Sequence, residues 1–299
     1  MADALPVTPA PDTADRPKAI RALLERYGLR ARKELGQHFL SDPTLLDKIV
    51  RAAELTSAAT VLEIGPGPGM LTRHLVQVAG RVVAVELDDG MVRLLRTELG
   101  ALHNVEIVQG DILKLSPITL LVSPAAATKG AAPASYAVVA NLPYYITTAV
   151  IRHLLESEPP PFRMVLTMQL EVAQRIVAVP GDMSLLAVSV QFYGEPRIVA
   201  RIPAGAFVPP PQVDSAVLRV DTYPRPPVDV PGRADFFRVV RAGFGQKRKQ
   251  LKNALTGGLG LPGPTIAAAL AQAGIAPQRR AETLSLAEWA ALAWAFNST

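Results

Sequence analysis

The stretch Thr60-Val61-Leu62-Glu63-Ile64-Gly65-Pro66-Gly67-Pro68-Gly69 decides the fold. Its first half, Thr60 to Ile64, reads as a strand that runs into a glycine-rich turn. The glycines that follow let the backbone approach a ligand where a Cβ would collide. A helix is expected from about Met70 to Val78. The order of strand, turn and helix predicts an open α/β sheet with a ligand site beyond its strand ends.

The next expected strand, Arg81 to Val85, indicates what the ligand is. It ends on Glu86, about twenty residues after Gly65, where a carboxylate can accept both hydroxyls of a ribose. The glycine pattern is G-x-G-x-G, with Glu63 two residues before it, and this is similar to the first motif of methyltransferases that use S-adenosylmethionine. That cofactor has a ribose and a sulfonium but no pyrophosphate, so an acidic strand end does not repel it.

Two further strand ends carry polar groups. Asp111 follows the expected strand Val105 to Val108 and can accept a hydrogen bond from an adenine amine. The run Tyr136 to Ala140 leads into Asn141-Leu142-Pro143-Tyr144, in which a proline-restricted turn holds a carboxamide, a free carbonyl and an aromatic face together. An acceptor pair beside a stacking surface suits a planar base with an exocyclic amine, although Asn and Pro also favour ordinary turns at strand ends.

Composition excludes several classes of protein. The 299 residues are 49% hydrophobic and contain no cysteine, which excludes disulfides, thiolate metal sites and cysteine nucleophiles and is compatible with a cytoplasmic protein. The four histidines show no ligand spacing, so no metal is expected. No apolar run is long enough to span a membrane, and the first 17 residues do not read as a signal peptide.

The remaining elements complete an α/β domain followed by a helical one. Besides those above, strands are expected at 164–168, 184–192, 196–202 and 213–220, which is one run more than the seven-stranded sheet that the last two are expected to complete as an antiparallel pair. Helices are expected at 19–27, 43–54, 89–99, 146–156, 170–179, 234–244, 247–255, 264–273 and 286–296, and 115–135 as a surface loop. These predict a disordered lead-in over 1–18, a Rossmann-like domain over 19–222 and a helical domain over 223–299, after a proline-dense linker.

Basic residues gather in two places. Residues 201–299 hold 12 basic and 6 acidic side chains, while the whole chain has a formal net charge of +5. Within that third, four cations lie within six residues: Lys247, Arg248, Lys249 and Lys252. The second place is Arg32 and Lys33, before the first expected strand. A charge run is usually a solvated face, but next to a base-binding site it is suited to neutralising the phosphates of RNA.

From about Arg30 to the last helix, the chain resembles the bacterial 16S ribosomal RNA adenine dimethyltransferases (the RsmA or KsgA family), relatives of the Dim-type and Erm methylases. The matching motifs are Gly36-Gln37-His38-Phe39-Leu40, Val61 to Gly69, Val85 to Asp88, Gly110-Asp111, Asn141 to Tyr144, Phe207 to Ser215, Lys247 to Leu251 and Arg280 to Ser285. His38 departs from the pattern, because many relatives have Asn there. The resemblance implies a Rossmann-like class I methyltransferase domain with a small all-helical C-terminal domain.

The resemblance also implies roles for individual residues. The cofactor is expected at His38, Leu40, Glu63, Gly65, Gly67, Gly69, Glu86, Asp111 and Asn141. Catalysis is expected at Asn141, Leu142, Pro143, Tyr144 and Phe207, with the target base between the rings of Tyr144 and Phe207. RNA phosphates are expected at Arg32, Lys33, Lys247, Arg248, Lys249 and Lys252. No metal is required.

The expected reaction transfers methyl groups from S-adenosylmethionine to the N6 amines of two adjacent adenosines near the 3′ end of 16S rRNA. S-adenosylhomocysteine is the other product. The expected partner is the small (30S) subunit or its precursor, and the protein is expected to act as a cytoplasmic monomer. Three alternatives remain: an Erm-type 23S rRNA methyltransferase, a DNA adenine methyltransferase and a noncatalytic ribosome-assembly or RNA-binding factor. The residues Arg280 to Ser285 look more like those of the small-subunit enzymes.

Overall fold

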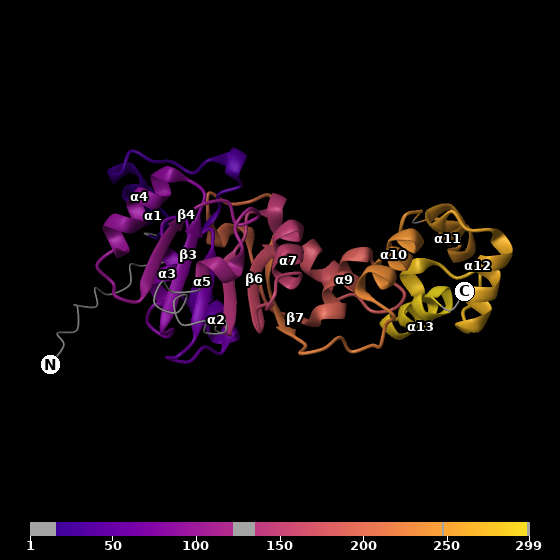
Figure 1. Ribbon diagram of the computed structural model, residues 1–299. Coiled ribbons are helices and arrows are strands. Elements are labelled where there is room, and N and C mark those ends of the chain that lie inside the picture. The colour runs from indigo at the N-terminus through magenta and orange to yellow at the C-terminus, as the bar shows by residue number, and fades with distance from the viewer. Residues whose placement is uncertain (1–15, 122–134, 247, 298–299) are drawn as a thin grey trace.

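A seven-stranded sheet forms the centre of the computed structural model, which describes residues 16–121, 135–246 and 248–297 (Figure 1). Across the sheet the strands are β4 (Val105–Gln109), β3 (Arg81–Glu86), β2 (Thr60–Ile64), β5 (Tyr136–Asn141), β6 (Arg163–Gln169), β9 (Ser215–Thr222) and β7 (Gly194–Ile202). The five strands from β4 to β6 are parallel, and β9 runs antiparallel to both β6 and β7. The predicted seven-stranded sheet and its antiparallel edge pair are confirmed.

The register of the parallel strands brings their carboxyl ends to one edge. Ile64 pairs with Val85 on one side and Ala140 on the other, and Glu86 pairs with Gln109. The polar groups that follow these strands therefore lie together, as expected for a sheet of this kind.

Helices cover both faces of the sheet, because alternate strand residues point to opposite sides. The helices before the C-terminal group are α1 (Arg16–Arg26), α2 (Pro43–Ala53), α3 (Met70–Leu75), α4 (Asp89–Leu99), α5 (Pro117–Leu121), α7 (Thr147–Leu155), α8 (Leu170–Ile176) and α9 (Leu185–Tyr193). On one face Leu62 and Val138 pack with α5, α7 and α8, whereas on the other Val61 and Val139 pack with α2 and α3. This double burial explains why the strands are apolar runs rather than alternating ones.

One predicted strand, 184–192, is wrong. The segment is helix α9, and the side chain of its N-cap residue Ser184 accepts a hydrogen bond from the Ala187 amide at 3.1 Å. Two different cores bury this helix: Val190 packs against the sheet, and Phe192 stacks on Phe236 with ring centroids 4.7 Å apart. A helix that is apolar all round has no clear 3.6-residue period, so its sequence was mistaken for a buried strand.

The C-terminal helices form a separate group at the end of the molecule away from β4 (Figure 1). They are α10 (Arg233–Phe244), α11 (Leu251–Leu259), α12 (Gly263–Gln272) and α13 (Leu286–Asn297). Their core surrounds Trp289 and also includes Ala187 and Phe192 of α9. Helix α9 therefore joins the two cores, and the domain boundary at residue 222 stays a prediction.

The helix predicted over 247–255 begins later, so most of the basic residues between 247 and 252 lie before it. Helix α11 begins at Leu251, so Arg248 and Lys249 lie in the turn before it and Lys252 in its first turn. The Leu251 amide donates to the Arg279 carbonyl at 2.7 Å, which fixes the start of the helix. Lys247, residues 1–15 of the predicted lead-in and residues 122–134 of the predicted loop lie outside the described residues, whereas Arg16, Pro17 and Lys18 belong to α1.

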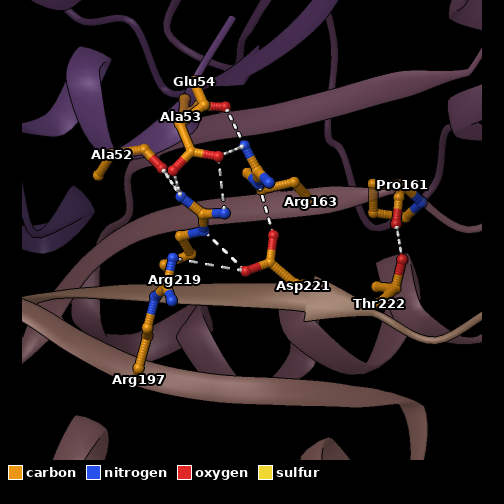
Figure 2. Close-up of polar contacts among 9 residues, drawn as sticks. All are labelled: Ala52, Ala53, Glu54, Pro161, Arg163, Arg197, Arg219, Asp221 and Thr222. Atoms are coloured by element: carbon orange, nitrogen blue, oxygen red, sulfur yellow. Dashed lines mark hydrogen bonds and ion pairs between the residues drawn. The ribbon is translucent and has the colours of Figure 1, made fainter.

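An ionic network closes the opposite edge of the sheet, where β6 begins (Figure 2). Glu54 ends α2 in the left-handed region, at φ 48°, which is uncommon for a residue with a side chain. Its carboxylate lies 2.6 Å from the Arg219 guanidinium and 2.9 Å from that of Arg163. Both arginines also reach Asp221, at 2.8 Å and 2.5 Å. The network therefore ties the end of α2 to β6 and β9.

Among the residues that the structure describes, no helix combines the length and apolar character needed to cross a membrane.

Candidate active site

A cavity opens at the carboxyl edge of the parallel strands. Its lining comes from five segments of the chain: 35–39, 64–67, 85–87, 110–112 and 141–146. They include the ends of β2, β3, β4 and β5, together with the segment that precedes β1 (Phe39–Leu40). The structure thus brings together Gly65, Gly67, Glu86, Asp111 and Asn141, as the sequence predicts.

The three glycines of the turn have different surroundings. A Cβ on Gly65 would meet only Pro143 and the Asn141 carbonyl, both at 3.8 Å or more, so this position is open toward the cavity. A Cβ on Gly67 would lie 2.8 Å from the Phe39 ring, and one on Gly69 would lie 3.0 Å from Leu95. Gly69 does not line the cavity. Only Gly65 therefore has the environment expected for close ligand approach, while the other two are required by packing.

Glu86 is held firmly at the end of β3. It is 6% exposed, and its carboxylate accepts hydrogen bonds from the amides of Gly67 at 3.0 Å and Asp88 at 2.9 Å. Burial nevertheless raises its pKa, an effect that these hydrogen bonds oppose. A carboxylate anchored at this edge of the cavity presents fixed acceptors to a diol.

Glu63 is placed beneath the glycine turn rather than in the main cavity. It is 1% exposed, and burial raises its pKa to about 8. Its Oε2 atom has no hydrogen-bond partner within the described part of the chain. Glu63 is therefore protonated at neutral pH. It lines a smaller pocket, together with Leu40, Gly65 and Asn141.

Asp111 stands at the other side of the cavity from the residues of β5. Its Oδ1 atom accepts a hydrogen bond from the Leu113 amide at 3.0 Å, and Oδ2 lies 3.7 Å from the Lys114 ammonium. Its side chain is about one-third exposed. The carboxylate is thus oriented by the backbone and still accessible to a ligand amine.

Asn141 is oriented by the segment before β1. Its Nδ2 atom donates to the His38 carbonyl at 2.9 Å, which leaves the Oδ1 atom as the acceptor of the carboxamide. Pro143 packs beside the positive-φ glycines Gly36 and Gly65, since Cβ atoms there would lie 3.6 Å and 3.8 Å from its ring. The proline therefore fixes Asn141 and Leu142 between the two glycine-containing segments.

Tyr144 lines the cavity and is held at its hydroxyl and on one face of its ring. Its hydroxyl lies 2.7 Å from Ser215 Oγ, and its ring stacks on His38, with centroids 5.8 Å apart and planes inclined by 21°. Burial raises the pKa of the Tyr144 phenol. The tyrosine is therefore a neutral aromatic surface at neutral pH.

Phe207 and Leu40 are not placed as predicted. Strands β1 and β8 (Phe207–Val208) pair with each other, Leu40 opposite Phe207, and both side chains are buried in the core beneath the sheet. Phe207 is 2% exposed and does not line the cavity. In this conformation its ring offers no open face to a base, so the arrangement does not bring together the predicted pair of stacking rings.

The candidate phosphate contacts have different surroundings. Arg32 forms ion pairs with Glu34 at 3.1 Å and with Asp88 at 3.2 Å, and half of its side chain is exposed. Arg248, Lys249 and Lys252 are exposed, and no ion pair joins them to an acid among the described residues. These three cations are available to a polyanion.

No role was predicted for two residues that line the cavity. Tyr145 is 61% exposed and Leu87 is 52% exposed, which is unusual for large apolar side chains. Each directly follows a residue that was predicted, Tyr144 and Glu86. Position next to a strand end is the signal that could have identified them.

The residues fit S-adenosylmethionine. The donor set combines a fixed carboxylate for a diol, an accessible carboxylate for an amine and an open glycine, with apolar walls from Ile64, Val85, Leu87 and Ile112. Among residues 16–121, 135–246 and 248–297, no cluster of three His, Cys, Asp or Glu side chains could hold a metal ion. This fold and this site define an S-adenosylmethionine-dependent methyltransferase.

Comparison with known proteins identifies the family. The model of the ribosomal RNA adenine dimethylase family matches residues 28–297. The chain is 49% identical over 269 residues to ribosomal RNA small subunit methyltransferase A of Dehalococcoides mccartyi, covering 90% of this chain and 89% of the relative. The protein of the same name from Pelotomaculum thermopropionicum is 44% identical, with 94% and 96% covered. The chain belongs to the ribosomal RNA adenine dimethylase family, as its motifs predict.

Solved structures agree. A dimethyladenosine transferase from Plasmodium falciparum superimposes with a TM-score of 0.72 at 25% identity, over 87% of this chain and 98% of that one. The 23S rRNA methyltransferase ErmE superimposes with a TM-score of 0.67 at 28% identity, over 87% and 99%.

Proposed function

We propose that this protein dimethylates the N6 amines of two adjacent adenosines in a hairpin loop near the 3′ end of 16S rRNA, during assembly of the small ribosomal subunit. The observation that carries the proposal is the hydrogen bond from Asn141 Nδ2 to the His38 carbonyl, which leaves the carboxamide oxygen as the acceptor of a side chain that lines the cavity together with Tyr144. The names of the relatives support the small subunit as substrate.

The bound cofactor supplies an electrophilic methyl group on a sulfonium. Glu86 holds the ribose and Asp111 the adenine amine, while Gly65 gives the backbone room to approach. His38, Leu40, Glu63, Gly67 and Gly69 support this site through packing and backbone contacts, since their side chains or Cβ directions are occupied by the protein.

The chain prepares the amine for attack. An adenine amine is a poor nucleophile, because its lone pair is conjugated with the ring. Donation of its hydrogens to Asn141 Oδ1 and to the Leu142 carbonyl favours a pyramidal nitrogen. Positioning of this kind can lower the activation free energy by roughly 7–11 kcal/mol. The Tyr144 ring holds the base by stacking, and the nitrogen loses its proton after it has been methylated, so no strong general base is needed.

RNA binding is proposed for the exposed cations of the C-terminal region, with Arg32 and Lys33 contributing from the N-terminal side. The partner is the 30S subunit or its precursor, and we propose that a cytoplasmic monomer acts on it. The resemblance to ErmE makes 23S rRNA the second substrate to test.

One experiment tests the substrate. Purified protein and labelled cofactor are incubated with under-methylated small subunits, large subunits and duplex DNA, and the nucleosides are analysed by mass spectrometry. Dimethyladenosine in the small subunit alone supports the proposal. Label in the large subunit alone would support an Erm-type enzyme, and RNA binding without label would support a noncatalytic assembly factor.

Variants of the amine and base contacts test the mechanism. Asn141→Ala should lower the single-turnover rate, because it removes the acceptor that aligns the nitrogen. Tyr144→Ala should lose base stacking, worth about 1–3 kcal/mol, whereas Tyr144→Phe should keep much of the activity. If Tyr144→Phe were as inactive as Tyr144→Ala, the hydroxyl held at Ser215 would be the working group, and the stacking role would be wrong.

A further inference from the structure

His38 lines the cavity, and three of its contacts are with other residues of the chain. Its carbonyl accepts the hydrogen bond from Asn141 Nδ2. Its Nδ1 atom lies 2.8 Å from the Pro209 carbonyl, which can only accept, so this nitrogen carries the proton. Its ring stacks on Tyr144.

We propose that His38 is a positioning residue of the target-base site, which fixes Asn141 through its carbonyl and Tyr144 through its ring. This role is separate from the contact with the cofactor that is expected at His38. The proposal rests on the proposed function, because it concerns the base that this site methylates.

The carbonyl contact decides which end of the Asn141 amide meets the substrate. A carboxamide in the opposite orientation would bring two oxygens together, since the His38 carbonyl cannot donate. The contact therefore excludes the flipped amide and keeps Oδ1 as the acceptor. This is the orientation that accepts a hydrogen from an amine.

The ring contact decides which face of Tyr144 is free. Aromatic atoms in contact lie about 3.5–4 Å apart, so a base between two rings requires centroids roughly 7 Å apart. The centroids of His38 and Tyr144 are 5.8 Å apart. A base therefore does not fit between them, and the face of Tyr144 away from His38 is the one that stacks on it. The Pro209 contact prevents the imidazole from turning away.

Side-chain variants test the ring, because they leave the backbone carbonyl in place. His38→Ala should lower the single-turnover rate at saturating RNA and cofactor at least tenfold and leave S-adenosylhomocysteine affinity within threefold. His38→Phe, which keeps a ring, should restore the rate to within threefold of wild type. His103→Ala is the matched control, because this histidine is exposed and lies outside the cavity. In a Tyr144→Leu background, the effect of His38→Ala should shrink to less than threefold.

A second measurement is independent of methylation. The imidazole C–H resonances of His38 should carry a ring-current shift that disappears in Tyr144→Leu, and nitrogen spectra should show the proton on Nδ1. An unchanged resonance, independent effects of the two substitutions on the rate, or a large loss of S-adenosylhomocysteine affinity in His38→Ala would overturn the proposal. If the wild-type protein methylated none of the RNAs but still showed the ring-current shift, the proposed function would be refuted instead.

Discussion

Replacement of Glu63 by Gln tests the electrostatics beneath the glycine turn. Burial raises the pKa of Glu63 from 4.5 to about 8, so between these values the folded protein holds a proton that the unfolded chain has released. The free energy of unfolding must then fall as the pH rises through this window. Each unit of pKa difference corresponds to about 1.36 kcal/mol, so this group alone lowers stability by ~4 kcal/mol between pH 5 and pH 8.

Glu63→Gln removes the titration and keeps the shape of the side chain. The variant should differ little from wild type at pH 5, where Glu63 is neutral, and should be more stable by up to ~4 kcal/mol at pH 8. Urea denaturation followed by far-ultraviolet circular dichroism at several pH values measures this difference. Glu171→Gln, on the exposed side of α8, is the matched control and should show no such trend.

The refuting result is a stability difference that does not change with pH. It would mean that Glu63 has the same pKa in both states, and therefore that water or another group solvates its carboxylate in the folded protein.

Three further predictions concern binding and stability. Glu86→Ala should weaken S-adenosylmethionine binding by ~1.5–3 kcal/mol in calorimetry, the range for hydrogen bonds to a charged group; unchanged affinity in a folded variant would remove Glu86 from the site. Replacement of Arg248, Lys249 and Lys252 by Gln should flatten the salt dependence of RNA binding by about 0.7–0.9 log units per lost contact and leave cofactor affinity unchanged; an unaltered slope would make them a solvated surface. The hydrogen bond from Arg219 above all lowers the pKa of Glu54 to about 2, so the stability it contributes is complete above pH 4.5 and lost toward pH 2. Melting curves of Glu54→Gln should therefore show the larger deficit at neutral pH than in acid.

The sequence was sufficient for the sheet and for the order of groups along its edge. The parallel strands β2, β3, β5 and β6 are largely apolar, whereas the edge strand β4 is mixed, and each ends at a glycine or a polar residue. Such ends meet at one edge by geometry alone. This is why Gly65, Glu86, Asp111 and Asn141 could be assigned before their distances were known. Helix α9 was missed, because burial on two sides removes the period on which the prediction depends.

The contacts that orient the side chains could not be predicted, because they join segments far apart in the chain. His38 reaches Asn141 and Pro209 across 103 and 171 residues of sequence. Phe207 was taken as a stacking ring, because a proline-rich loop reads as exposed. The pairing of β8 with β1 buries it instead.

The two edges of the sheet respond to pH in opposite ways. At the carboxyl edge, the burial of Glu63 weakens the fold above pH 4.5, because the unfolded chain releases a proton there that the folded protein keeps until about pH 8, and the raised pKa of Glu86 acts in the same direction. At the other edge, Glu54 has already gained its full stabilising effect at that pH. The ionic network around Arg219 (Figure 2) is therefore complete in the pH range where the burial of Glu63 and Glu86 lowers the stability of the fold. The contribution of Glu54 rises up to about pH 4.5 and the cost of Glu63 begins there, so these two groups alone place the greatest free energy of unfolding near pH 4.5.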